Sequence, residues 1–404
     1  MIPSIRRLLV MLLAAPALGI PTVAPAQADS APAAAQDPVA QLVARLDLEQ
    51  YKATIKGLTQ FGDRRQGTDR NRAAVNWIEA QLRSYGCADV ARLKYVYQPP
   101  PPRTRTEGAG PARDSSRASG GGRYRGVRAG TGVNNDSLRQ PDARLRALDA
   151  PASTPGARDE VYCTKVGSVH PGEMYIVGAH MDGIGWGEAA NDDGSGTALV
   201  MQLARIFSGP DVRTGRSIRF VLWNNEETGL NGSRAYVEQR QALQGKEDPP
   251  GSGKYPEPTW LGMIQHDMML FDHGMPRSDG TLSPEQRPEA DVNIEFQASA
   301  KFASQAQQLA WTFAAANEKY ATDYPASVGS HMTNTDSAPF QDLVAAISLR
   351  ENERGAHIGA GWDPHWHQPT DLYSAYSDKD FRLGLNAAQT TLAALAGLVG
   401  TTIK

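Results

Sequence analysis

Five loops that follow apolar runs of the chain carry histidine or carboxylate side chains. In chain order they contain His180 and Asp182; Asp192 and Asp193; Glu226 and Glu227; His266 and Asp267; and His365, His367 and Asp371. Imidazole and carboxylate groups without cysteine fit a hydrolytic zinc site better than a closed structural one. Each loop alone also has an ordinary explanation as a polar turn or a helix cap. Their joint occurrence favours a metal centre.

The residue types in three of these loops indicate which chemistry the centre could perform. His180 can bind a metal ion while Asp182 accepts a hydrogen bond from its other ring nitrogen. The carboxylate of Asp192 has two oxygens and could bridge two cations about 3.5–4 Å apart. Of the adjacent pair Glu226 and Glu227, one could bind metal while the other takes a proton from an activated water. This set predicts metal-assisted hydrolysis.

The segments around these loops alternate between strand and helix patterns. Apolar runs predict strands at 174–179, 218–223, 261–269 and 345–349. Helical spacing of apolar residues predicts helices at 39–58, 72–85, 197–207 and 379–398, the last with Ser377 as its cap. Such alternation predicts one α/β domain with a mixed, largely parallel central sheet flanked by helices, and a site beyond the strand ends.

The N-terminus has the pattern of a secretory signal. Two arginines precede an apolar run at 8–20, and Ala26-Gln27-Ala28 fits a cleavage site. We expect residues 1–28 to be a signal peptide, 29–37 a disordered linker and 38–404 the folded domain. The run is shorter than the ~20 residues a bilayer requires, so no stable membrane anchor is expected. The protein is therefore predicted to be exported, to the periplasm or beyond it.

Composition excludes some partners and marks an insertion. A formal charge of -3 and a pI near 6.3 give no electrostatic reason to expect a nucleic-acid partner.

Residues 99–158 combine a proline tract, consecutive glycines and mixed charges, which predicts a flexible insertion rather than a binding patch. Cys87 and Cys163 lie on either side of it. They suit either one disulfide in an oxidising compartment or two buried thiols.

The order and context of these motifs resemble one family, the co-catalytic di-zinc aminopeptidases of the secreted bacterial leucyl aminopeptidase type. Glutamate carboxypeptidase II and the glutaminyl cyclases are related to it. The resemblance covers most of the chain outside the insertion and implies the zinc exopeptidase fold with two Zn²⁺ ions as cofactors. It makes His180 and Asp267 ligands of one zinc, Glu227 and His367 ligands of the other, and Asp192 the bridge between them.

The resemblance also implies an activity and further roles. Peptides would be the substrates, and their N-terminal residues would be hydrolysed by a zinc-activated water with Glu226 as general base. Asp182 would support His180, and the peptide bond between Asp192 and Asp193 would be cis. The segment 335–340 looks like one that shapes the pocket in the family.

One position departs from the family pattern. Some relatives have a tyrosine just before the last metal-binding histidine, where its hydroxyl stabilises the oxyanion, and here Trp366 stands there. The oxyanion donor is therefore unassigned, with His365 as a candidate. His365 also competes with His367 as the ligand, and the resemblance favours His367, because its spacing to Asp371 matches the family's His-x-x-x-Asp.

Three other functions remain open on the sequence. A glutaminyl cyclase with a single zinc or a carboxypeptidase-like relative would share much of the ligand set. A non-catalytic peptide- or zinc-binding protein could keep the fold, but it would have no need for Glu226 as a base. The preferred N-terminal residue of a substrate depends on pocket side chains that sequence does not place, and the oligomeric state is equally open.

Overall fold

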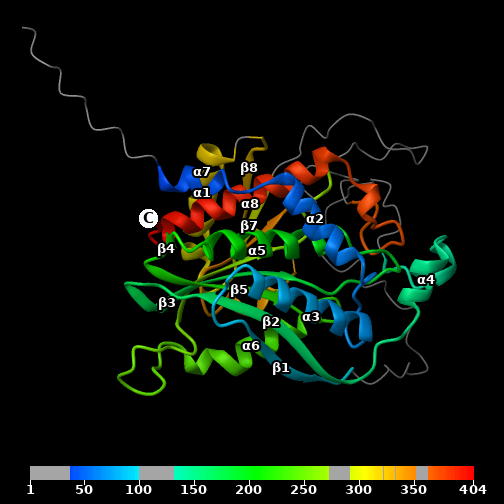
Figure 1. Cartoon of the computed structure of the whole chain (residues 1–404), viewed down its shortest axis with the longest axis horizontal. Helices are drawn as coiled ribbons and strands as arrows, with labels where there is room; N and C mark the ends of the chain where they lie inside the picture. The colour runs from blue at the N-terminus through cyan, green and yellow to red at the C-terminus, as the bar shows by residue number, and fades with distance from the viewer. Residues whose placement is uncertain (1–36, 100–131, 273–291, 322, 333, 352–362) are drawn as a thin grey trace, which may run out of the picture. The chain divides into compact units, whose positions relative to one another are not determined.

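An eight-stranded sheet forms the centre of the protein (Figure 1). In pairing order its strands are β1 (Ala91–Tyr97), β2 (Gly156–Lys165), β5 (Arg216–Trp223), β3 (His170–His180), β6 (Thr259–His266), β9 (Ala346–Arg350), β7 (Val292–Phe296) and β8 (Ala326–Gly329). The four central strands β5, β3, β6 and β9 run parallel, whereas the pairs β1–β2, β2–β5 and β7–β9 are antiparallel. The predicted α/β fold with a mixed, largely parallel sheet is confirmed.

The structure is a computed structural model that describes residues 37–99, 132–272, 292–321, 323–332, 334–351 and 363–404. The predicted signal peptide at 1–28 and all of the predicted linker except residue 37 lie outside these ranges. No helix within the described ranges is both long and apolar enough to cross a membrane.

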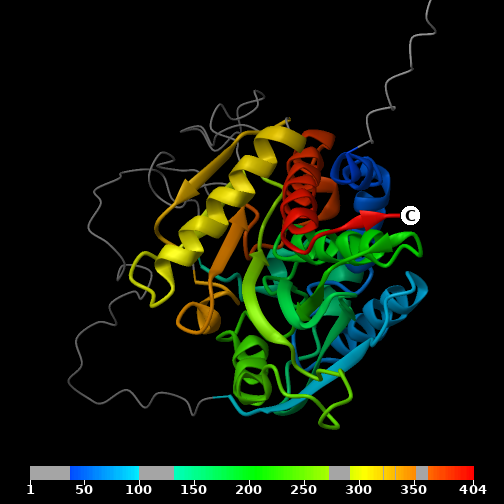
Figure 2. The same ribbon diagram turned by 90° about the vertical axis from the view of Figure 1, so that its left-hand side faces the viewer.

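Helices cover the two faces of the sheet unequally (Figures 1 and 2). On one face lie α2 (Leu48–Thr59), α3 (Asp69–Ser84), α5 (Gly194–Phe207), α7 (Ala303–Tyr320) and α8 (Asp378–Leu398), with α1 (Pro38–Val43) beside α8. In α5 every residue except Arg205 is buried, because this helix lies between the sheet and the helices α2 and α8. The other face is covered by α6 (Asn231–Arg240). A separate two-stranded sheet consists of β4 (Val212–Arg213) and β10 (Thr402–Ile403).

Side chains alternate along each strand, so each strand contributes to a hydrophobic core on either face of the sheet. Val177 of β3 packs in the larger cluster beneath the helices, while its neighbour Ile176 packs in the cluster on the opposite face. That second cluster includes several aromatic side chains, and Trp223 of β5 contacts Tyr236 of α6 with ring centroids 5.4 Å apart. The strands are therefore apolar on both faces, as expected for the buried centre of a parallel sheet.

Two sequence predictions differ from the structure. The helix predicted at 39–58 is two helices, because Asp47 interrupts it and accepts a hydrogen bond from the backbone N–H of Gln50 at the start of α2. The insertion expected to be a flexible loop contains ordered elements in its second half. These are a 3₁₀ helix, η2 (Ser137–Arg139), and α4 (Ala143–Asp149), whereas residues 100–131 lie outside the described ranges.

A disulfide joins Cys87, which follows α3, to Cys163 in β2, across a sequence separation of 76 residues. Of the two alternatives that the sequence left open, the structure has the bonded one. The bond links the helical layer to an antiparallel outer strand of the sheet and closes the long excursion that contains the insertion.

Replacing both cysteines by alanine should lower the free energy of unfolding by about 2–5 kcal/mol, because the unfolded chain would no longer be restricted by the closed loop. Urea unfolding followed by circular dichroism would measure this for the wild-type and Cys87→Ala/Cys163→Ala proteins, with reduced wild-type protein as the matched control. Equal unfolding midpoints for all three would contradict the prediction.

A buried charge cluster anchors the end of α4 to the segment that precedes α3. Asp149 accepts a hydrogen bond from the backbone N–H of Asp63 at 3.1 Å and lies 3.4 Å from Nε of Arg70. Arg70 donates to the carboxylate of Asp63 at 2.8 Å, so the two aspartates share one guanidinium. Burial, together with the nearby Asp63 carboxylate, raises the pKa of Asp149 to about 8.

This raised pKa predicts a pH-dependent stability. The pKa of Asp149 in the unfolded chain is near the ordinary value of about 3.9, so between about pH 4 and pH 8 the folded state binds more protons and its stability falls as pH rises. Asp149→Asn should flatten this decline. Urea unfolding of both proteins at pH 5, 7 and 9 tests it, and an equally steep decline in the variant would show that Asp149 is not the responsible group.

Candidate metal centre

The predicted site residues meet at the carboxyl ends of adjacent parallel strands. His180 is the last residue of β3, Asp267 directly follows β6, and Glu226 and Glu227 lie in the loop after β5. Asp192 lies just before α5, and the residue that follows it, Asp193, caps the start of this helix. Because the strands are neighbours in the sheet, residues far apart in sequence come together here.

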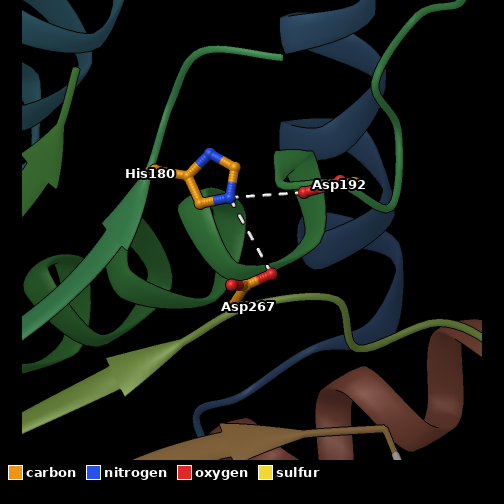
Figure 3. A group of neighbouring side chains, drawn as sticks. All are labelled: His180, Asp192 and Asp267. Carbon is orange, nitrogen blue, oxygen red and sulfur yellow. Dashed lines mark ion pairs between the residues drawn. The ribbon is translucent and has the colours of Figure 1, made fainter. Parts of the chain in front are cut away.

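Two sets of three possible ligands form at this edge, and they share one residue. The atoms of His180, Asp192 and Asp267 lie within 4.8 Å of one another, and so do those of Asp192, Glu227 and His367. Nε2 of His180 is 3.2 Å from Oδ1 of Asp192 and 3.8 Å from Oδ1 of Asp267 (Figure 3). The structure thus brings together all five residues predicted as metal ligands.

The second set uses the other oxygen of Asp192. Nε2 of His367 lies 3.0 Å from Oδ2 of Asp192 and 2.9 Å from Oε2 of Glu227. Each oxygen of Asp192 therefore faces a different histidine. A carboxylate held in this way has the orientation that bridging two cations requires.

His365, the competing histidine, belongs to neither set. Its Nδ1 is hydrogen-bonded to the hydroxyl of Thr370 at 2.9 Å, and its ring contacts that of Tyr376. Trp366 stacks on the His367 ring with centroids 4.1 Å apart, so it helps to fix that imidazole. The geometry agrees with the preference for His367 that the spacing to Asp371 indicated.

Asp182 acts differently from the expectation. Nδ1 of His180 is 3.0 Å from the backbone carbonyl of Asp182, whereas the nearest carboxylate oxygen of Asp182 is 4.0 Å away. That carboxylate instead accepts a hydrogen bond from the backbone N–H of Glu226 at 3.0 Å. Asp182 therefore orients the histidine through its main chain and the loop bearing Glu226 through its side chain.

Residues to which the motifs gave no role hold Asp192 in place. Asp371 accepts hydrogen bonds from the backbone N–H groups of Asn191 and Asp192, at 2.9 and 3.1 Å. Asp193 receives the backbone N–H of His180 at 3.1 Å and caps α5 through the N–H of Gly196. The bond between Asp192 and Asp193 is a cis peptide. The family resemblance implied this isomer, but not the hydrogen bonds around it.

The electrostatics of the site favour bound cations. Burial raises the pKa of Glu227 to about 7, with Asp192 adding to the rise and His367 opposing it. Burial and the neighbouring Glu227 also raise the pKa of Glu226 well above its usual range. Oε1 of Glu227 is buried and has no hydrogen-bond partner among the described residues. An imidazole and carboxylate set with such an unsatisfied oxygen fits zinc.

A family model described as peptidase family M28 matches residues 161–390, which is more than half of the chain and includes all five of these residues. The chain belongs to peptidase family M28. The matched region begins in β2 and ends within α8, so it contains the parallel strands that carry the site.

Curated relatives match shorter segments of the chain. The probable lipoprotein aminopeptidase LpqL of Mycobacterium tuberculosis is 40% identical over 82 residues, which is 20% of this chain and 16% of that protein. Carboxypeptidase Q of Xenopus laevis is 36% identical over 73 residues, 18% of this chain and 16% of that protein. The matched segments therefore span less than a fifth of either relative.

Solved structures match over most of the chain. BSAP, a zinc aminopeptidase from Bacillus subtilis, has a TM-score of 0.56 at 16% identity, covering 88% of this chain and 96% of that one. The glutaminyl cyclase of Porphyromonas gingivalis has a TM-score of 0.55 at 17% identity, covering 88% and 99%. At such identities these similarities show the fold alone, and two different activities share it.

The two histidines near the site give a direct test of the ligand assignment. His367→Ala should lower the zinc bound per chain, because it removes a nitrogen that faces both Asp192 and Glu227. His365→Ala is the matched control and should keep the wild-type zinc content. Metal analysis after dialysis measures both. Normal zinc in His367→Ala with loss in His365→Ala would reverse the assignment.

Proposed function

We propose that this protein is an exported zinc aminopeptidase that hydrolyses N-terminal residues from peptides with two Zn²⁺ ions. The observation that carries the proposal is the position of Asp192, whose two oxygens face two histidines in two complete ligand sets. His180 and Asp267 would hold one ion, Glu227 and His367 the other, and Asp192 both. When bound, the ions polarise the substrate carbonyl and make water more acidic.

Glu226 is the residue best placed to move protons. It is partly exposed, lies next to Glu227 in the chain and belongs to neither ligand set, so its carboxylate is left for chemistry. Asp182 fixes its backbone N–H. Glu226 would take a proton from the attacking water and pass it to the leaving amine, so that the peptide bond yields a carboxyl group and a free amine.

Export is supported by the signal-like N-terminal sequence and by the disulfide. Disulfides persist in oxidising compartments and are rare in the cytosol, and the Cys87–Cys163 bond joins elements of the folded core. A periplasmic or extracellular location agrees with both features.

A single-zinc glutaminyl cyclase is the main alternative, since a solved cyclase shares the fold. The two ligand sets favour the aminopeptidase, because a single-ion cyclase has no need of both. Analysis of the products separates the two activities, since a cyclase releases ammonia from an N-terminal glutamine and leaves the peptide bond intact.

Hydrolysis of aminoacyl-p-nitroanilides by the mature protein tests the proposal. Activity should be lost on chelation and restored by zinc, and Glu226→Gln should lower kcat by about 10²–10⁴-fold while keeping bound zinc, since it removes only the base. Glu238→Gln, at an exposed glutamate of α6, is the matched control. Absence of release by folded, zinc-loaded protein, together with cyclisation of glutaminyl peptides, would replace this function by that of a cyclase.

A further inference from the structure

An arginine lies beside the metal centre at the end of the next strand. In the parallel pair β6–β9, His266 is in register with Leu349, so Asp267 and Arg350 follow at the same edge of the sheet. Arg350 is only 4% exposed. Its Nη2 donates to Oδ2 of Asp267 at 2.5 Å, while Oδ1 of Asp267 is the oxygen that faces His180.

The guanidinium of Arg350 has more donors than the described protein uses. Its Nε is buried and has no hydrogen-bond partner among the described residues. Among the described residues, its Nη1 faces the thioether sulfur of Met268 at 3.8 Å, which is a weak acceptor. Buried N–H groups without acceptors are rare and costly. The planar fork of an arginine is matched to carboxylates, which it can bind through two parallel hydrogen bonds.

Glu295 of β7 is a second acidic neighbour of this arginine. It is buried, and it raises the pKa of Arg350 together with the nearer Asp267 against the opposing effect of burial. Its described hydrogen bond comes from the side-chain amide of Asn293, at 2.9 Å. The carboxylates of Asp267 and Glu295 thus stabilise the positive charge of Arg350. Its Nε remains without an acceptor among the described residues.

The order of the strands in the sheet indicates which part of a bound peptide would approach Arg350. Across the site the order is β5, β3, β6 and β9, with Glu226 after β5 at one end and Arg350 on β9 at the other. In the proposed function Glu226 passes a proton to the leaving amine, so the part of the peptide after the cleaved bond would lie on the β5 side. The N-terminal residue, with its side chain, then extends past Asp267 toward β9.

We propose that Arg350 binds the side-chain carboxylate of an acidic N-terminal residue, so that the protein prefers peptides that begin with aspartate or glutamate. This inference rests on the proposed aminopeptidase function and names its substrate class. The buried position strengthens such a charge-assisted hydrogen bond, because little water competes for it. A neutral amide side chain of the same size offers one acceptor oxygen and no negative charge, so its hydrogen bonding to Arg350 would be weaker.

The test compares kcat/KM for the p-nitroanilides of glutamate and glutamine, whose side chains have the same size but differ in charge and in one acceptor oxygen. The wild-type protein should prefer glutamate by at least about tenfold. Arg350→Gln should reduce this ratio to about one or below, and Arg350→Lys should retain part of it. Arg382→Gln, at an exposed arginine of α8, is the control for loss of a positive charge. Zinc content is measured for each protein.

The ratio of kcat/KM for the glutamate and glutamine substrates shows whether Arg350 binds the substrate side chain or only positions Asp267. If Arg350 only positions Asp267, its variants lower kcat/KM for both substrates equally and leave the wild-type ratio, which would overturn the inference. A wild-type protein that cleaves leucyl and glutaminyl substrates but shows no preference for glutamate also overturns it and leaves the aminopeptidase function intact. Failure to cleave any substrate removes both. A preference for dipeptides with a free C-terminal carboxylate that Arg350→Gln abolishes would assign the arginine to that group instead.

Discussion

The site depends on holding the buried carboxylate of Asp192 between two histidines. Its backbone is held in place, because Asp371 accepts hydrogen bonds from the N–H groups of both Asn191 and Asp192. Asp193 then ties the same turn to the start of α5 and to the N–H of His180. From this fixed backbone the carboxylate of Asp192 places one oxygen beside His180 and the other beside His367. The neighbouring parallel strands β3, β5 and β6 end beside Asp192, and they place three of the proposed ligands at or just after their ends near its carboxylate.

The sequence predicted the features that depend on local pattern. Apolar runs located β3, β5, β6 and β9, and the loops after them supplied all five proposed ligands. The choice of His367 over His365 came from its spacing to Asp371 and agrees with the geometry. The strands were predicted correctly because their apolar pattern is encoded within a few residues, whereas the roles of the five ligands remain predictions.

Features that depend on three-dimensional contact were beyond the sequence. Asp182 was expected to support His180 with its side chain, but that side chain turns to the N–H of Glu226. Arg350 carried no motif, since its nearness to Asp267 follows from the register of β6 with β9. The disulfide stayed open for the same reason, because composition does not show whether two cysteines meet.

The ordered half of the insertion has a structural role at the metal centre. The backbone N–H of Asn134 donates to the carbonyl of His367 at 3.0 Å, and its side-chain amide donates to Gly185 at 3.2 Å. Gln140 donates to the carbonyls of Trp186 and Pro369. His367 has a positive φ, and these hydrogen bonds satisfy carbonyl groups of the loop that carries it. A low-complexity composition thus concealed a segment whose polar side chains position a proposed ligand, because hydrogen bonds to a distant backbone leave no periodic pattern in the sequence.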